Sequence, residues 1–420
     1  MRILMTYENL IPLSQADAEQ FVNNAMAMSR RGHHVDFLIP EKHDRKKSAA
    51  EEVREYYQVD GPLHIDELPS RTWNLGAQHL YHALQVPKDP RFRLADFVYT
   101  RNLGMLTSCL ANGQKVLYEH YRPWGDQFPP MQVWLRQVMT HPNFLGMILH
   151  SDYAKQSYLR LGIPDEQLCV CHNGWEPKRM EPRLSKEEAR KKLGLPLDRR
   201  IVVYTGRMNH KKGLDVAIEL ARRLPDHLFV LVGSTGDGPV EREAASVPNV
   251  KIVEWQPFSG TAAYLYSADV VLVPPSLAPL LEHGNTVLPI KLFIYLASGR
   301  PILAADNPDI HEILRPDYNA VLVRPGDVDG ATTALRELLA DPERMERLGR
   351  GSWEEAKSLT WDARAERIEK FVEGRLAAPR AVPGPWSASE CLKQTGEWVS
   401  GFPKRRWVRT PEHLKALADG

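Results

Sequence analysis

Two short stretches of the chain carry residues suited to binding an anion. The first, VVYTGRMNHKKGLD at residues 202–215, runs from an apolar strand ending at Gly206, through a basic loop, to a helix expected to start near Gly213. Open α/β folds bind ligands at the carboxyl edge of the sheet, so we expect Arg207 and Lys212 at that edge. Two cations beside a helix N-terminus suit a diphosphate. From this stretch alone, a solvated basic loop is an equal alternative.

The second stretch, HGNTVLPIKLFIYLASGRP at residues 283–301, is expected to form a glycine loop that opens a short helix stopping at Gly299. Pro289 fits the first turn of such a helix, and the helix dipole favours a bound anion by about 0.3–1 kcal/mol. The helix carries no carboxylate, and Ile294 occupies its middle. A buried helix with an ordinary first turn is the alternative. The backbone N–H groups offered to an anion would be those of Gly284, Asn285 and Thr286.

The elements that must position these stretches form two βα series. Apolar strand-like runs alternate with helical patterns, which is typical of parallel sheets with helical crossovers. The first series has strands expected at 2–6, 33–39, 96–100, 115–120 and 146–150, with a helix at 15–31. The second has strands expected at 201–206, 228–233, 250–255, 269–275, 301–305 and 320–325, followed by helices at 327–340, 343–358 and 361–375. We therefore predict an α/β protein with two doubly wound, Rossmann-like domains facing across a cleft.

Composition and length set the domain boundaries. A chain of 420 residues is too long for one ordinary core. The charged, proline-bounded stretch at 177–200 suits a linker with a surface helix, and 377–386 is a proline-rich linker. The expected order is a first domain at 1–176, the linker at 177–200, a second domain at 201–360, a crossover helix at 361–376 and a C-terminal tail at 377–420. Tryptophans in the tail argue against plain disorder and favour its packing onto a domain.

Charge and cysteine content narrow the class of protein. A formal net charge of +1 gives no global field for nucleic acid. Cys169 and Cys171 would alternate across a strand and point to opposite faces, so they are poor metal partners. Few cysteines, no signal-peptide pattern at the start and no long apolar run lead us to expect a cytoplasmic protein.

Taken together, the two stretches are more specific than either alone. The pattern GR-x4-KG after a strand, followed about 75 residues later by KLFIYLASGRP, resembles the nucleotide-sugar half of GT-B glycosyltransferases of family 4. The likeness continues through VLVGSTGDGP at 230–239, SADVVLVPPS at 267–276 and AVLVRPGDVDG at 320–330. In the first half it covers RRGHHV, VYTRN, YEHY and CVCHNGWEP, so it spans about residues 1–375 and leaves out the tail.

This resemblance implies a function for particular positions. It implies that Arg207 and Lys212 grip the donor diphosphate, that the Gly284–Thr286 loop meets the donor's sugar and phosphate, and that His120 lies near the transferred sugar. Ser14 would contact phosphate or acceptor, although its loop, Leu13-Ser14-Gln15-Ala16, departs from the frequent Gly-Gly of the family. Gly206 and Trp255 complete the expected donor-binding set. The reaction implied moves a sugar from a nucleoside diphosphate sugar to an acceptor (glycan, lipid or small molecule) with retention of configuration, and it needs no cofactor and no metal.

Ile294 marks a departure from the family. Members commonly carry two glutamates eight positions apart, and here those positions are Thr286 and Ile294. The second glutamate usually accepts hydrogen bonds from the ribose hydroxyls of the nucleotide. Losing a charge-assisted hydrogen bond costs about 1.5–3 kcal/mol, or about 10- to 150-fold in affinity. We expect that Asn285 or Lys291 supplies replacement contacts, or that the donor is bound in a different way.

Two other functions stay open beside that of a glycosyltransferase. A non-catalytic GT-B protein that binds a glycan or partner fits the loss at Ile294. A nucleotide-sugar epimerase would need a carboxylate pair, and Glu119 is expected to point away from His120 by strand alternation. GSTGDG at 233–238 has the wrong spacing for a dinucleotide fingerprint, and Asp327 is expected to cap a helix. The tail segment FPKRRWVR, at 402–409, favours the ordinary packing of cation stems over tryptophan, with peripheral contact with a membrane surface as the alternative.

Overall fold

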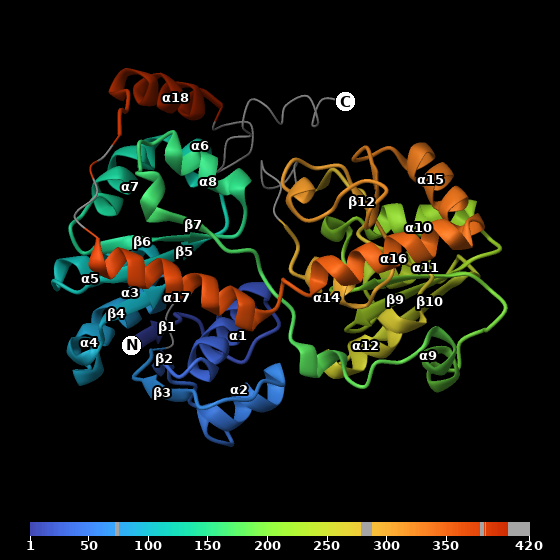
Figure 1. Cartoon of the computed structure of the whole chain (residues 1–420), viewed down its shortest axis with the longest axis horizontal. Coiled ribbons are helices and arrows are strands. Elements are labelled where there is room, and N and C mark those ends of the chain that lie inside the picture. Colours follow the sequence, from blue (N-terminus) through green and yellow to red (C-terminus); the bar gives the residue numbers. More distant parts are fainter. Residues whose placement is uncertain (72–74, 279–287, 379–381, 383, 402–420) are drawn as a thin grey trace. The chain divides into compact units, whose positions relative to one another are not determined.

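The computed structural model describes residues 1–71, 75–278, 288–378, 382 and 384–401, and these form two α/β units (Figure 1). The first unit joins Met1–Asn173 to the described residues from Trp361 onward, and the second is Gly174–Thr360. Residues 177–200, which the sequence suggests as a linker, fold within the second unit as a 3-10 turn and the helix α9.

The described residues of the first unit contain a parallel sheet of seven strands in the order β3-β2-β1-β4-β5-β6-β7. The strands are β1 (Arg2–Thr6), β2 (His34–Pro40), β3 (His64–Leu68), β4 (Phe97–Thr100), β5 (Val116–His120), β6 (Phe144–Leu149) and β7 (Leu168–Val170). The helices are α1 (Ala16–Arg30), α2 (Ala49–Tyr57), α3 (Leu75–Gln85), α4 (Pro90–Leu94), α5 (Leu103–Ala111), α6 (Trp124–Gln127), α7 (Gln132–Met139), α8 (Asp152–Leu159), α17 (Trp361–Ala377) and α18 (Ala388–Gly401), with 3-10 turns η1 (Val86–Lys88), η2 (Pro129–Met131) and η3 (Asp165–Gln167).

The second unit has, in its described part, a parallel sheet of six strands in the order β10-β9-β8-β11-β12-β13. The strands are β8 (Ile201–Thr205), β9 (Leu228–Ser234), β10 (Val250–Glu254), β11 (Val270–Leu272), β12 (Ile302–Ala305) and β13 (Ala320–Val323). The helices are α9 (Lys186–Leu193), α10 (Leu214–Arg223), α11 (Pro239–Ala244), α12 (Phe258–Ser267), α14 (Lys291–Ala297), α15 (Val328–Ala340) and α16 (Pro342–Ala356), with 3-10 turns η4 (Pro177–Met180), η5 (His210–Lys212) and η6 (Ile310–Glu312). The predicted α/β class is confirmed, and every strand expected in the second series is present.

Apolar residues on both faces of the strands explain why helices cover both faces of the second sheet. Val203 of β8 belongs to an apolar cluster that includes Leu292 of α14, whereas its neighbour Val202 belongs to another that includes Ile218 of α10. Successive side chains of a strand point to opposite faces, so a continuous apolar run such as IVVY is buried on both sides. Helix ends are fixed locally as well: the side chain of Asp327 accepts a hydrogen bond from Gly330 N at 2.8 Å and caps α15, as expected.

The helix α17 belongs to the first unit although it follows the second in sequence (Figure 1). Its Asp362 pairs with Arg30 of α1 at 2.7 Å, and its Glu369 pairs with Arg31 at 2.5 Å. The ring of Phe371 lies so close to β6 that a Cβ at Gly146 would approach it to 2.5 Å. The chain therefore returns to complete the first unit.

The described part of the tail also packs on the first unit. Gly384 N donates to Gly162 O at 2.8 Å, and Gln132 Nε2 donates to Gln394 Oε1 of α18 at 3.0 Å. Cys391 is buried, and its thiol donates to Pro129 O at 3.4 Å. These contacts agree with the expectation that the tail packs onto a domain. The basic and aromatic segment at 402–409 lies outside the described residues.

Candidate functional site

The carboxyl end of β8 opens the basic loop identified from the sequence. Gly206 follows the strand with a φ of 138°, and its N–H donates to Val232 O of β9 at 2.9 Å. Arg207 and Lys212 are exposed on the loop, and Gly213 adopts a φ of 74° directly before α10. A Cβ at Gly213 would lie 2.5 Å from the side chain of Ser276 after β11. The glycine thus lets two neighbouring strand ends meet, and the helix begins where the sequence predicts.

Lys291, the first residue of α14, reaches the same strand end. Its Nζ lies 3.8 Å from the ring centroid of Tyr204 in β8, and a Cβ at Gly206 would come within 2.6 Å of it. Burial lowers the pKa of Lys291 well below its usual value, and the positive charge of Lys212 lowers it further. A bound anion would favour the charged form of Lys291, which burial disfavours. From the sequence, Lys291 was expected only as a replacement for the contacts of the glutamate that Ile294 replaces. The feature that could have indicated its position is that it is the only charged residue within the apolar run LPIKLFIYLA.

The rest of α14 is held by the core. The hydroxyl of Tyr295 accepts a hydrogen bond from Thr205 N at 2.8 Å, which ties the helix to the end of β8. Ile294 is half-buried and packs against the apolar cluster beside it. Pro289 lies before the helix, whose first residue is Lys291, so its placement in the first turn was wrong; Pro289 O accepts from Leu292 N at 3.0 Å in a tighter turn. Gly284, Asn285 and Thr286 lie outside the described residues.

A hollow of about 520 Å³ lies at the ends of β9 and β10, lined by Ser234, Gly236, Glu254 and Trp255 among others. Trp255 is 45% exposed, and its backbone N–H donates to Ser234 O at 2.7 Å. Because β10, β9 and β8 are neighbours in the sheet, this hollow follows the carboxyl edge that Gly206 begins. The edge therefore offers cations near its centre and an exposed indole at one side.

His120 ends β5 in the first unit and is buried among aromatic rings. The ring centroid of Trp124 lies 4.0 Å from that of the imidazole, and Tyr158 OH is 3.5 Å from Nδ1. Nδ1 lies 3.2 Å from Arg122 N and 3.3 Å from Arg122 O, so the backbone of Arg122 holds the ring in place. Burial, reinforced by the charge of Arg101, lowers the pKa of His120 well below its usual value. The imidazole is therefore neutral at physiological pH.

The neighbouring Glu119 centres a buried polar network that sequence reasoning missed. It accepts hydrogen bonds from Gln20 Nε2 at 2.5 Å, His150 Nε2 at 2.5 Å and Arg364 at 2.8 Å, and also from the Tyr99 hydroxyl. Burial alone would raise the pKa of Glu119, but the charge of Arg364 and the hydrogen bond from His150 hold it below its usual range. Glu119 and His120 face different surroundings, as strand alternation predicted. The only sequence signal for Arg364 was an arginine on the apolar face of a helix.

The loop after β1 carries Ser14, which is exposed. The backbone of the adjacent Leu13 is fixed by Tyr57 of α2, whose hydroxyl accepts from Leu13 N and donates to Leu13 O, both at 3.0 Å. Arg45 donates to Ile11 O at 2.9 Å from the other side. The loop Leu13-Ser14-Gln15-Ala16, which contains no glycine, is thus held in place by side chains.

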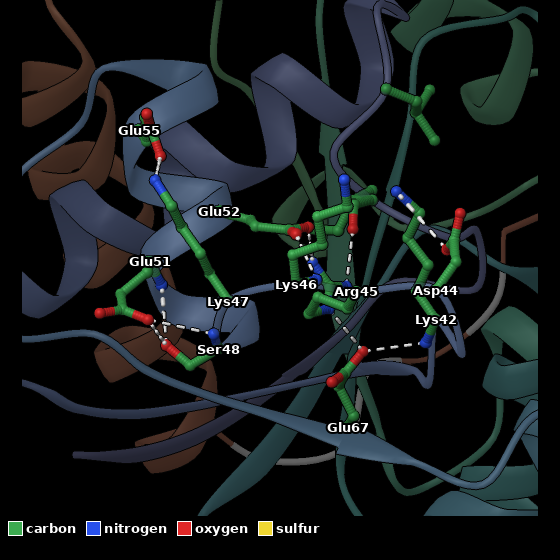
Figure 2. A network of polar contacts seen from close by, with 12 residues as sticks. Lys42, Asp44, Arg45, Lys46, Lys47, Ser48, Glu51, Glu52, Glu55 and Glu67 are labelled. Atoms are coloured by element: carbon green, nitrogen blue, oxygen red, sulfur yellow. Dashed lines mark hydrogen bonds and ion pairs between the residues drawn. The ribbon is translucent and has the colours of Figure 1, made fainter.

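Figure 2 shows how Arg45 is itself fixed. Its guanidinium pairs with Glu52 at 2.5 Å and with Glu67 at 3.0 Å, and the arginine side chain is only 5% exposed. Ser48 and Glu51 form a capping box at the start of α2, which anchors the segment that presents Arg45. The network stabilises the loop that holds Ser14.

The prediction that Cys169 and Cys171 point apart was wrong. Their Sγ atoms lie 3.4 Å from each other. Strand β7 ends at Val170, so Cys171 lies beyond it and the alternation of a strand does not apply. The contact with Cys171 lowers the pKa of Cys169.

The structure thus brings together Gly206, Arg207, Lys212 and Lys291 at one sheet edge of the second unit, with Trp255 further along it. His120 and Ser14 lie in the first unit. Among the residues described, no group of three or more His, Cys, Asp or Glu side chains is placed to hold a metal ion. Across that same part of the chain, no helix is both long and apolar enough to span a membrane.

Comparison with known proteins finds a family match within the second unit. Residues 185–354 match the family model described as "Glycosyl transferases group 1". The chain is 29% identical over 216 residues to a sulfoquinovosyl transferase, SQD2, from Arabidopsis thaliana, covering 48% of this chain and 39% of that protein. It is 30% identical over 239 residues to a D-inositol 3-phosphate glycosyltransferase from Thermobispora bispora, covering 52% and 54%. In these pairings the chain spans about half the length of the curated relatives or less.

Solved structures match over nearly the whole chain. A glycosyltransferase from Rickettsia africae superposes with a TM-score of 0.71 at 13% identity, covering 90% of this chain and 99% of that one. The Anabaena protein HepE in complex with UDP-glucose superposes with a TM-score of 0.65 at 15% identity, covering 89% and 100%. The fold therefore consists of two Rossmann-like α/β domains with parallel sheets, matching GT-B glycosyltransferase structures.

Proposed function

We propose that the protein is a retaining glycosyltransferase that moves a sugar from a nucleoside diphosphate sugar to a nucleophilic acceptor. The observation that carries this proposal is the convergence of Arg207, Lys212 and Lys291 at the carboxyl edge of β8. Three cations at the edge where open α/β sheets bind ligands suit a diphosphate better than any neutral ligand. The family match of the second unit supports this assignment.

In the proposed reaction, the bond between the sugar C1 and the diphosphate oxygen breaks, and a bond from the acceptor oxygen to C1 forms on the same face. Negative charge grows on the departing diphosphate, and Arg207 and Lys212 stabilise it there. The acceptor's proton passes to a phosphate oxygen. Lys291, whose pKa is lowered in the free protein, is stabilised in its charged form by the diphosphate. These cations supply the charge that a divalent metal would otherwise provide, so we propose a metal-independent reaction.

The remaining positions receive supporting roles. We propose that the nucleotide base binds in the hollow beside Trp255 and that the transferred sugar lies near His120, whose neutral imidazole can form a hydrogen bond with it. Ser14, on its braced loop, would meet phosphate or acceptor. We place the reaction in the reducing cytoplasm, and leave contact of the tail with a membrane surface as a proposal.

Ile294 favours a second candidate function. Its side chain packs against the apolar cluster and offers the ribose no hydrogen bond, so this GT-B chain would be a binding protein for a glycan or partner that no longer takes a donor. The two candidates differ in one measurable property, which is the binding of nucleoside diphosphates. The epimerase alternative loses its nearest carboxylate, because Glu119 is fully engaged in the buried network.

The first test is thermal-shift screening against UDP, GDP, ADP, TDP and their sugar conjugates. UDP-sugars head the panel because HepE was solved with UDP-glucose. Ligand at 100 times its dissociation constant stabilises the folded state by about 2.7 kcal/mol. A shift with one base supports the enzyme, and no shift across the panel supports the binding protein.

Lys212→Ala then tests the site itself. Turnover of the identified donor is expected to fall at least about 100-fold, comparable to the loss of one group that stabilises a leaving charge, while the unfolding midpoint changes little because Lys212 is exposed. Lys251→Ala, an exposed lysine on β10, is the matched control and should leave turnover unchanged. Equal activity in the two variants would contradict the assignment of Lys212.

A further inference from the structure

A second cationic site lies at the amino-terminal edge of the second sheet. A cavity of about 400 Å³ is lined by residues that precede strands: Arg200 before β8, Asp269 before β11 and Pro301 before β12. It therefore opens at the opposite ends of the strands from Gly206 and Lys291. A volume of this size falls within the range of small-molecule pockets.

The lining is rich in cations. Arg183, Lys186, Arg200, Arg300 and Arg350 contribute five positive charges, and Asp269 and Glu346 contribute two negative ones. Several of these cations are already paired within the unit. Lys186 and Arg200 lie 2.7 Å and 3.3 Å from Asp269, and Arg350 lies 2.6 Å from Glu346.

The guanidinium of Arg300 has an N–H group that no described acceptor satisfies. One terminal nitrogen donates to Tyr266 O at 2.5 Å, while Nε is buried without a hydrogen-bond partner among the described residues. Burial lowers the pKa of Arg300, and the neighbouring charge of Arg183 lowers it further. A buried guanidinium N–H without an acceptor is costly, and a bound anion would satisfy it.

Arg183 is the second uncommitted cation. Its guanidinium stacks on the ring of Trp353 at 3.9 Å, and within the part of the chain that the structure describes it has no carboxylate partner. Its terminal nitrogen lies 3.0 Å from where a Cβ at Gly299 would be, so a side chain at that position would crowd Arg183. Arg183, Arg300 and the indole of Trp353 all line the cavity.

We propose that this cavity binds the anion of a small phosphomonoester, with Arg183 and Arg300 donating to the phosphate and the organic part lying against Trp353. Guanidinium groups match the geometry of phosphate oxygens and bind them in pairs of hydrogen bonds. Met345 and Pro301 extend the apolar surface next to the indole. The site is independent of the nucleotide-sugar function proposed above.

The test is calorimetric titration of the full chain with glucose 6-phosphate, inorganic phosphate and glucose. Glucose 6-phosphate is expected to bind, inorganic phosphate more weakly, and glucose at no measurable level. Arg183→Gln should weaken glucose 6-phosphate binding about 10- to 150-fold, the loss of a charge-assisted hydrogen bond. Arg183 is exposed, so this variant is expected to fold normally.

Two control variants test whether the phosphate binds in this cavity or at the β8 edge. Arg315 stacks on Tyr318 at 4.0 Å in the same unit but does not line the cavity, so Arg315→Gln should bind like the wild type. Lys212→Ala removes a cation of the β8 edge and should also bind normally. Binding lost in Lys212→Ala and kept in Arg183→Gln would place the phosphate at the β8 edge and overturn the proposal. Absence of binding by the wild type at millimolar concentrations would overturn it as well.

Discussion

Lys291→Met is expected to make the protein more stable and a weaker binder of UDP. Methionine has a similar length, keeps contact with the ring of Tyr204 and removes the charge that burial disfavours. Each unit by which a lysine pKa is depressed corresponds to about 1.4 kcal/mol of destabilisation while the lysine stays protonated. Loss of the cation–π contact opposes this by about 1 kcal/mol, and the sulfur–ring contact replaces much of that. We expect a net gain in the free energy of unfolding at neutral pH, because the charge that burial disfavours is removed.

The affinity should change in the opposite direction. Lys291 is expected to donate a charge-assisted hydrogen bond to the diphosphate, and its loss costs about 1.5–3 kcal/mol, or about 10- to 150-fold in the dissociation constant of UDP. Calorimetric titration with UDP measures the affinity, and urea unfolding measures the stability. Lys251→Met, an exposed lysine on β10, should change neither quantity.

The pH dependence supplies a further check. Between the folded pKa of Lys291 and its unfolded value near 10.4, the unfolded chain holds a proton that the folded chain has released. The stability of the wild type therefore rises with pH across this window relative to the variant, and the gap between them narrows. A variant that is less stable than the wild type and binds UDP equally well would refute both the buried charge and its role.

Three other predictions concern the first unit. Glu119→Gln leaves the buried charge of Arg364 without its carboxylate and should lower the unfolding free energy of that unit by about 3–5 kcal/mol in urea titrations; a change below about 1 kcal/mol would contradict the network. Burial lowers the pKa of His82 to about 3, so below pH 6.5 the unfolded chain binds a proton at His82 that the folded chain does not. The free energy of unfolding, measured at pH 7, 5.5 and 4, should therefore fall by up to about 1.4 kcal/mol per pH unit because of this residue. His82→Gln should reduce that slope, and an unchanged slope would exclude His82 as its source. Cys169 is half-buried and has a lowered pKa, whereas burial raises the pKa of Cys109 to about 12. Cys169 should therefore react with iodoacetamide at least about tenfold faster than Cys109 in the native protein, as followed by peptide mass spectrometry. Equal reaction rates would contradict this difference in pKa.

Local sequence patterns predicted much of the fold. Continuous apolar runs such as IVVYT predicted strands buried on both faces, and the order of strands and helices predicted parallel sheets. Gly213 marked the start of α10 because it stands between a polar loop and an amphipathic pattern. The strand β3 escaped prediction, since it carries His64, Asp66 and Glu67 within five residues. A strand was expected at Cys169 and Cys171, but β7 has only three residues and ends at Val170.

The candidate site was predictable only in part. The spacing of Gly206, Arg207 and Lys212 identified one sheet edge, because those residues are close in sequence. The stacking of Lys291 on Tyr204 joins residues nearly ninety positions apart, and no local pattern encodes it. The same holds for Arg364 and Glu119, whose pairing depends on the return of α17 to the first unit.

That return of α17 also has a consequence for synthesis on the ribosome. The second unit occupies Gly174–Thr360, and at 5–20 residues per second its translation delays the arrival of α17 by roughly 10–40 s. Throughout this interval the nascent first unit holds Glu119 without Arg364, and it exposes the surface around Gly146 that Phe371 will cover. Among the described residues the second unit is one continuous segment, which can finish folding before the first. A protein truncated after residue 360 would therefore contain a complete second unit and an incomplete first unit. Separate expression of the first unit requires that residues 361–401 be fused after residue 173.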